Sequence, residues 1–239
     1  MGCLFMKDKI IFIIIFLQIT VNLFAEKLFV APDFPEMEII RYRAIKKTST
    51  NIKIIEKRLI KTNIMGETYY KIYTHSSEGF KRIELLNKDL ITAKFLQIDN
   101  GIIERKFEIY NNKIHLIVPS ENINKSIKIN EPVYDIKSLQ YVLRGYPWDK
   151  SYVKFNIILN NGRIVRMRAK NLGIYKIKIP AGKFTAYKIL VEPLSPLVKL
   201  LYRTKVYLYF YTKSSFPYLK YEDSDGNIDE VIKIKTFSE

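Results

Sequence analysis

The chain has 239 residues, of which 48% are hydrophobic and 13% aromatic, and its formal net charge is +16. This length is enough for one domain with its own hydrophobic core. The lysines alternate with apolar residues rather than cluster, and no segment has the helix, arm or zinc-knuckle pattern of nucleic-acid binding, so nucleic acid is excluded as a partner. Two interpretations of the charge stay open: attraction to an anionic membrane surface, or lysine placed on exposed strand faces by composition alone.

Residues 1–25 have the pattern of a secretory signal peptide. Lysines precede an apolar run over residues 10–17, and Ala25 supplies a small residue at a cut site. The apolar run is shorter than the roughly 20 residues that a membrane span needs. We therefore expect a periplasmic protein whose mature chain begins at Glu26 and forms a single β domain over residues 26–239. The alternatives are secretion, or anchoring by an uncleaved signal.

Residues 37–130 predict an N-terminal antiparallel meander. Short runs that alternate apolar and polar side chains are typical of half-buried strands. Clusters of Asn, Asp, Gly, Ser and Lys separate these runs, as a meander of hairpins requires. The predicted turns are at 47–51, 76–79, 87–89, 99–101 and 111–112.

One short helix is expected to interrupt the meander, over about 136–144. Asp135 is a good N-cap, and Gly145 stands where a helix C′ residue is expected. The helix would lie between the two β halves, in a position to plug an open end of the curved sheet. Trp148 follows it at a corner, where both core packing and contact with a ligand are open. The apolar residues on one helical face are Ile136, Leu139, Val142 and Leu143.

A C-terminal meander is expected over residues 151–237, organised around a long hairpin at 172–193. Pro180, Ala181 and Gly182 form its turn, because Pro has no N–H for a strand ladder and Gly tolerates a positive φ. We expect Gly182 to need that freedom.

The strand expected over residues 198–212 is apolar on both faces. Such a strand is either covered on both sides or lines a cavity on one side. Tyrosine rings suit the wall of a pocket for a lipid-like ligand, and they suit the edge of a β core equally well. Together with Trp148, the tyrosines of this strand are the candidate ligand-binding residues. Val206, Leu208 and Phe210 point one way, and Tyr207, Tyr209 and Tyr211 point the other.

The hairpin phrase IPAGKFTAYKI, over 179–189, resembles an exported bacterial group known as domain of unknown function family 3108. Similar features are the aromatic strand at 206–211, the Ser-Phe-Pro-Tyr phrase at 215–218 and the Leu-Arg-Gly-Tyr-Pro run at 143–147. A tryptophan frequent in the family's aromatic strand is Tyr or Phe here. The resemblance implies export and a curved β-sheet body, and it supplies no catalytic residue.

Residues for catalysis or metal binding are scarce. His75 and His115 are far apart in sequence, and the only cysteine, Cys3, would be lost with the signal peptide, so we predict no metal site and no cofactor. No serine-nucleophile or phosphate-loop motif is present. Strand carboxylates could in principle pair as acid and base, although we expect them to face solvent. These carboxylates are Glu38, Glu84, Glu104 and Glu108.

These patterns together predict an all-β, mostly antiparallel protein: a strongly curved sheet or open half-barrel with one short central helix. The leading hypothesis for its function is a non-catalytic cell-envelope protein that binds a hydrophobic or amphipathic, lipid-like ligand. The alternative is a scaffold that docks another envelope component through a sheet edge or a basic face. A hydrolase comes third. The sequence predicts no oligomeric state.

Overall fold

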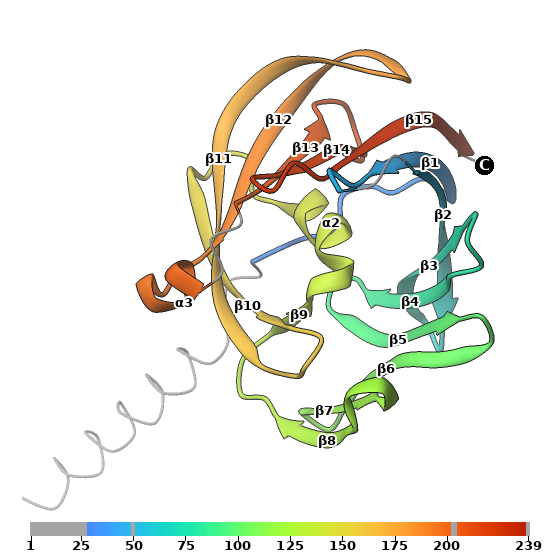
Figure 1. Ribbon diagram of the computed structural model, residues 1–239, viewed down its shortest axis with the longest axis vertical. Helices are drawn as coiled ribbons and strands as arrows, with labels where there is room; N and C mark the ends of the chain where they lie inside the picture. The colour runs from blue at the N-terminus through green and yellow to red at the C-terminus, as the bar shows by residue number, and fades with distance from the viewer. Residues whose placement is uncertain (1–27, 49–50, 202–204, 238–239) are drawn as a thin grey trace, which may run out of the picture.

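The computed structural model describes residues 28–48, 51–201 and 205–237, so the predicted signal peptide lies outside the described residues. Within them, one 15-stranded sheet curls around a short helical segment (Figure 1). The expectation of an all-β curved sheet with a central helix is confirmed. The strands are β1 (Met37–Ile45), β2 (Ile52–Ile64), β3 (Glu67–Ser76), β4 (Lys81–Asn87), β5 (Thr92–Asp99), β6 (Ile102–Tyr110), β7 (Lys113–Val118), β8 (Ile123–Lys128), β9 (Val133–Asp135), β10 (Tyr152–Ile158), β11 (Ile164–Ile179), β12 (Gly182–Pro193), β13 (Val206–Tyr211), β14 (Tyr218–Asp223) and β15 (Ile228–Phe237).

The first and last strands, β1 and β15, are neighbours at the middle of the sheet. From one edge to the other the strand order runs β8-β7-β6-β5-β4-β3-β2-β1-β15-β14-β13-β12-β11-β10-β9. Neighbours in sequence pair antiparallel from β1 to β8 and from β10 to β15, and β1 pairs antiparallel with β15. The pair β9–β10 is parallel. The N-terminal meander and the C-terminal meander thus form two halves of one sheet, and the seam between them is β1–β15.

The helical segment passes through the interior of the curl, as Figure 1 shows. It consists of the 3₁₀ turn η2 (Ile136–Ser138), α2 (Leu139–Val142) and the 3₁₀ turn η3 (Leu143–Gly145), close to the predicted bounds. The predicted N-cap is confirmed, because the Asp135 side chain accepts a hydrogen bond of 2.7 Å from the Lys137 amide.

Gly145 has a different role from the one expected. It lies inside η3 rather than beyond the helix in a left-handed conformation, and a Cβ atom here would lie 2.4 Å from the carbonyl oxygen of Val30. The amide of Val30 in turn donates to the Gly145 carbonyl at 3.3 Å. Close backbone approach of the entry segment, not helix termination, therefore requires glycine here.

The strand predicted over 198–212 is wrong in its first half. The chain forms helix α3 (Pro196–Leu201) there, and β13 begins at Val206. Proline at the first helical position has its φ angle already suited to a helix, and the residues after it do not alternate in polarity. β11 also begins earlier than the hairpin expected at 172–193, because it runs from Ile164 to Ile179 with a register shift between Asn171 and Ile174.

The turn at Pro180-Ala181 joins β11 to β12, and Ile179 lies opposite Gly182 in the register. Gly182 has a φ of +135°, which confirms the expected need for glycine. The amide of Ala181 donates to the carbonyl of Val231 on β15 at 3.1 Å. The hairpin tip is thereby held against the central seam of the sheet.

The two outer ends of the sheet meet through side chains rather than through strand pairing. The Lys125 ammonium donates to the Asn161 carbonyl at 2.8 Å, which links β8 to the β10–β11 turn. Beneath this contact lies a separate apolar cluster that includes Leu116 of β7, Val133 of β9 and Ile158 of β10. The larger core surrounds the helical segment and includes Phe29 of the entry segment. None of the helices within the described ranges has the length and apolarity to cross a bilayer.

Candidate ligand-binding cavity

A cavity of about 390 Å³ lies between the helical segment and the C-terminal half of the sheet. This volume is within the range of small-molecule binding sites. Its walls come from the first turns of the helical segment, from β10 to β14 and from α3. The lining residues are Ile136, Lys137, Leu139, Gln140, Ile157, Leu159, Val165, Met167, Val191, Pro193, Val198, Val206, Leu208 and Tyr221.

Strand alternation explains why the wall is aliphatic. Side chains two residues apart on a strand share a face, so Val206 and Leu208 of β13 both point to the interior. Opposite Leu208 in the register lies Ile189, which is fully buried, and opposite Val206 lies Val191. The helical segment adds Ile136 and Leu139 from the other side. The result is a concave apolar surface with few polar groups.

The polar groups in the wall are Lys137, Gln140 and Tyr221. The Tyr221 hydroxyl donates to the Asp223 carboxylate at 2.8 Å, so its polar end already has a partner. The pKa of Lys137 is lowered, first by burial and then by the positive charges of Arg82 and Arg105. The ammonium of Lys137 makes no ion pair within the described ranges. Asp135 and Glu84 partly offset this lowering of the pKa without forming an ion pair with Lys137. A cation without an ion-pair partner in a mostly aliphatic wall is unusual.

The predicted tyrosines do not line this cavity. Because Val206 and Leu208 face the interior, Tyr207 and Tyr209 project from the opposite, outer face of β13. Of the two faces of β13, the one that carries Val206 and Leu208 lines this cavity, and the one that carries the candidate tyrosines does not. Tyr211 also points outward, where its ring packs edge-on against Phe184 of β12, with ring centres 5.2 Å apart.

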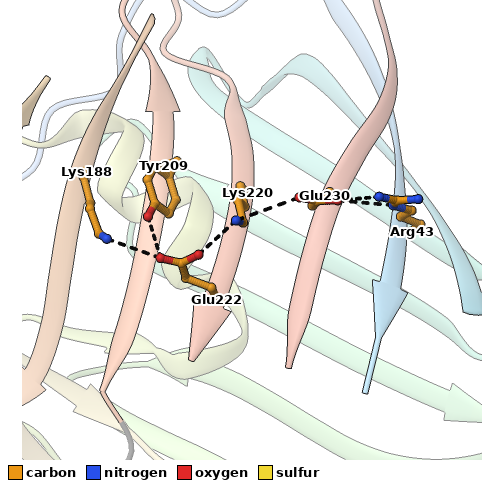
Figure 2. Close-up of polar contacts among 6 residues, drawn as sticks. All are labelled: Arg43, Lys188, Tyr209, Lys220, Glu222 and Glu230. Atoms are coloured by element: carbon orange, nitrogen blue, oxygen red, sulfur yellow. Dashed lines mark hydrogen bonds and ion pairs between the residues drawn. The ribbon is translucent and has the colours of Figure 1, made fainter. Parts of the chain in front are cut away.

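On the outer face Tyr209 belongs to a ladder of charged groups that crosses five strands (Figure 2). Its hydroxyl donates to Glu222 at 2.5 Å, and the Lys188 ammonium lies 3.3 Å from the same carboxylate. Lys220 bridges Glu222 at 2.9 Å and Glu230 at 3.9 Å, and Glu230 accepts from Arg43 at 2.8 Å. This ladder links β12, β13, β14, β15 and β1.

The pKa of Glu222 reflects this arrangement. Burial alone would raise it, but the hydrogen bonds from Tyr209 and Lys220 outweigh burial and lower it. The buried Tyr209 ring has a structural role, because its hydroxyl holds the Glu222 carboxylate in place. Ligand binding by Tyr207, Tyr209 and Tyr211 stays a prediction.

Trp148 does not line the cavity and lies among aromatic rings that include Phe210 of β13. It stacks on Tyr187 with ring centres 4.3 Å apart and contacts Phe210 and Phe216 at 5.8 and 5.1 Å. Its indole Nε1 is buried without a hydrogen-bond partner in the described protein. The structure therefore separates Trp148 from the three tyrosines, and ligand contact by Trp148 likewise stays a prediction.

Two of the carboxylates expected to face solvent are instead buried inside the barrel. Glu38 forms a two-armed pair with Arg144 of η3, at 2.6 and 3.0 Å. Glu84 accepts a hydrogen bond of 2.6 Å from Ser138, and burial raises its pKa. The expectation fails because alternation identifies the two faces of a strand but not which one the helical segment covers.

Glu108 follows the expectation, because it pairs at 2.9 Å with Lys94 on the outside of the sheet. His115 is exposed on β7, and His75 is exposed on β3. Within the described part of the chain, no group of three or more His, Cys, Asp or Glu side chains could hold a metal ion. The inward-facing charges, above all Arg144, were not found by sequence reasoning, because their partners lie far away along the chain.

No family model matches the chain, and no curated protein matches it. Among solved structures, a β-barrel-like DUF1849 protein from Brucella abortus matches with a TM-score of 0.54 and 7% identity, over 87% of this chain and 100% of that one. At this identity the similarity shows the fold alone. The resemblance to family 3108 stays a prediction.

Two further structures match with a TM-score of 0.33, which carries no argument. One is a Bacteroides fragilis protein with a YmcC-like fold, considered to be exported; it is 8% identical over 87% of this chain and 100% of that one. The other, from Parabacteroides distasonis, is considered a lipoprotein and is 11% identical over 86% of this chain and 99% of that one.

Proposed function

We propose that this protein binds a hydrophobic or amphipathic, lipid-like ligand in the cavity beneath the helical segment, without catalysing a reaction. The observation that carries the proposal is the cavity of about 390 Å³ with an almost wholly aliphatic wall. An apolar ligand in such a cavity removes both its own apolar surface and that of the wall from water. This burial stabilises the complex by about 25 cal/mol per Å² of apolar surface. The signal-peptide pattern and the resemblance to family 3108 support a location in the cell envelope.

The scaffold alternative has less support. The sheet does end in an edge strand, β8, whose outer backbone groups could pair with another chain. However, Lys125 and Lys128 lie on this strand and are exposed. Lysine on an edge strand is a common means of preventing such pairing. We therefore retain ligand binding as the conclusion.

Binding of the neutral probe N-phenyl-1-naphthylamine tests the proposal. Fluorescence titration should show saturable binding to the wild-type protein. The double variant Val165→Phe/Val206→Phe fills the cavity from two strands of its wall, β11 and β13. It should weaken probe binding by about tenfold or more, which corresponds to at least 1.4 kcal/mol. The control Tyr207→Phe changes the neighbouring residue on the outer face and should leave binding unchanged.

Circular dichroism melting checks that the double variant is folded, and the two single variants provide intermediate steps if it is not. Because cavity filling often stabilises a protein, we expect the melting temperature to be kept or raised. A folded double variant that binds the probe as tightly as wild type would contradict the proposal. So would a wild-type protein that does not bind it.

A further inference from the structure

A row of polar and cationic side chains crosses the inner face of the N-terminal half of the sheet. In the strand register Lys57 of β2 lies opposite Thr74, and Thr74 lies opposite Arg82. Arg82 lies opposite Gln97 of β5, which in turn lies opposite Arg105 of β6. Facing strand residues share one side of the sheet, so these side chains line one continuous strip inside the barrel.

The strip and the aliphatic cavity adjoin the same turn of the helical segment. Arg105 of the strip pairs with Asp135, whose carboxylate caps the turn that carries Lys137. Arg82 lies 3.5 Å from the Glu84 carboxylate, which accepts a hydrogen bond from Ser138, the residue after Lys137. The helical segment stands between strip and cavity, and Lys137 of that segment lines the cavity.

Several polar atoms of the strip lack a hydrogen-bond partner, although Arg82 pairs with Glu84 and Arg105 with Asp135. Arg105 is 3% exposed, and one of its nitrogens lies 2.5 Å from the Asp135 carboxylate. The other two guanidinium nitrogens of Arg105, Nε and Nη1, have no hydrogen-bond acceptor within the described residues. The same holds for Nε of Arg82 and for the side-chain oxygens of Thr74 and Gln97. Buried polar atoms are nearly always hydrogen-bonded, so atoms from outside the chain are expected to complete this strip.

Cations outnumber acids in this region. The cations are Lys57, Arg82, Arg105 and Lys137, and the acids near them are Glu84, Asp135 and Asp229. Arg82 and Arg105 have ion-pair partners in Glu84 and Asp135. The pKa of Lys57 falls to about 8, first because of burial and next because of Arg82. Lys57 and Lys137 make no ion pair within the described residues, so an added anion could pair with them.

We propose that the ligand is a single-chain amphipath with an anionic head group, whose head is held by Lys137 with Arg82 and Arg105 behind it and whose tail fills the aliphatic cavity. The inference rests on the proposed function and adds the ligand's chemical class. A carboxylate and a phosphate monoester offer the same kind of oxygen acceptors to these cations. The aliphatic wall excludes a purely ionic ligand, and the unpaired cation favours a charged amphipath over a neutral one.

Competition for the bound probe tests the inference. Decanoate and 1-decanol have chains of equal length and differ in the charge of the head, so their displacement of N-phenyl-1-naphthylamine isolates the anion. At pH 7 we expect decanoate to bind the wild-type protein about tenfold more tightly than decanol, and decyl phosphate to show the same preference over decanol. Raising the salt concentration should weaken the binding of decanoate but not the binding of decanol.

Lys137→Met should abolish the preference for decanoate while leaving the affinity for decanol unchanged. Lys137→Gln serves the same purpose if the methionine variant is poorly folded. The matched control is Lys154→Met, which removes an exposed lysine from the outer face of β10. It should keep the full preference.

The outcomes separate this inference from the proposed function. If decanoate and decanol displace the probe equally from wild-type protein, or if Lys137→Met keeps the preference, the anionic head is refuted while the cavity remains a binding site. If neither the probe nor either amphipath binds, the proposed function itself fails, and this inference fails with it.

Discussion

At the scale of single residues, the interior of this barrel contains ionisable groups that a β core ordinarily excludes. Lys57 is half-buried on the inner face of β2, with its ammonium 5.3 Å from the centre of the Tyr42 ring. Burial and the nearby Arg82 lower its pKa from the ordinary 10.5 to about 8, and Glu84 and Asp229 only partly offset this. The charged form of Lys57 therefore destabilises the folded state, and replacing Lys57 with a neutral residue should remove this cost.

This cost predicts how stability depends on pH. Between pH 8 and 10.5 the unfolded chain binds more protons at Lys57 than the folded chain does, so the free energy of unfolding should rise with pH in that window. One pKa unit corresponds to about 1.4 kcal/mol, so we expect Lys57 to contribute a rise of about 1–2 kcal/mol by pH 9.5.

Urea denaturation of wild type and Lys57→Met at several pH values between 7 and 9.5 measures this rise. The variant should be the more stable protein at pH 7, and the difference should shrink as pH increases. Lys154→Met, at an exposed site, should follow the wild-type curve. Parallel curves for wild type and Lys57→Met would refute the prediction.

At the scale of elements, the helical segment is held in the barrel by a buried ion pair. Arg144 donates to both carboxylate oxygens of Glu38 on β1 and, at 2.8 Å, to the carbonyl of Ser215 beyond β13. Its guanidinium also lies 4.5 Å from the centre of the Phe34 ring. One side chain therefore fixes η3 to the entry segment, to β1 and to the C-terminal half. Both charged groups are 1% exposed.

Breaking this pair should cost more than replacing it. Arg144→Met leaves Glu38 buried without a counter-charge, which typically costs 3–5 kcal/mol, so we expect a loss of about that size. The double variant Glu38→Leu/Arg144→Met should recover much of it, because two apolar side chains leave no buried charge. A double-mutant cycle from urea denaturation measures the coupling between the two residues. A loss of less than about 1 kcal/mol in the single variant would show that the pair does not hold the segment.

At the scale of the whole molecule, the sheet is strongest at its middle and weakest at its two ends. β1 is paired along its length on both sides, with β2 and with β15. β8 has a partner on one side, and β9 pairs with β10 through three residues. The first and last strands thus lie in the most continuous part of the sheet, and the edge strands come from the middle of the sequence (Figure 1).

Amide hydrogen exchange should reflect this gradient. Because local opening of an edge strand costs far less than opening a central one, we expect amides of β8 to exchange roughly a hundredfold or more faster than those of β1 and β15. Exchange followed by mass spectrometry of peptic peptides measures the rates. Equal or faster exchange at the β1–β15 seam would contradict this view of the fold.

The sequence by itself determined the local structure. Alternation with period two, Asn-Gly turns, the Asp135 cap and the positive φ of Gly182 depend on residues close together in the chain, so strands, turns and the central helix could be predicted. The error at 198–212 arose where an apolar run without clear periodicity follows Pro196, because such a run fits a helix as well as a strand.

Only the tertiary structure decided which face of each strand is inside. Both faces of β13 are apolar, and the helical segment covers Val206 and Leu208 rather than the tyrosines. The Glu38–Arg144 pair spans 106 residues, and the strip from Lys57 to Arg105 exists only because five strands pair in one register. The physical reason is that the buried face of a strand and the partner of a buried charge both depend on the residues that pack against them from across the barrel. Those residues are distant in sequence, so no local pattern encodes these contacts.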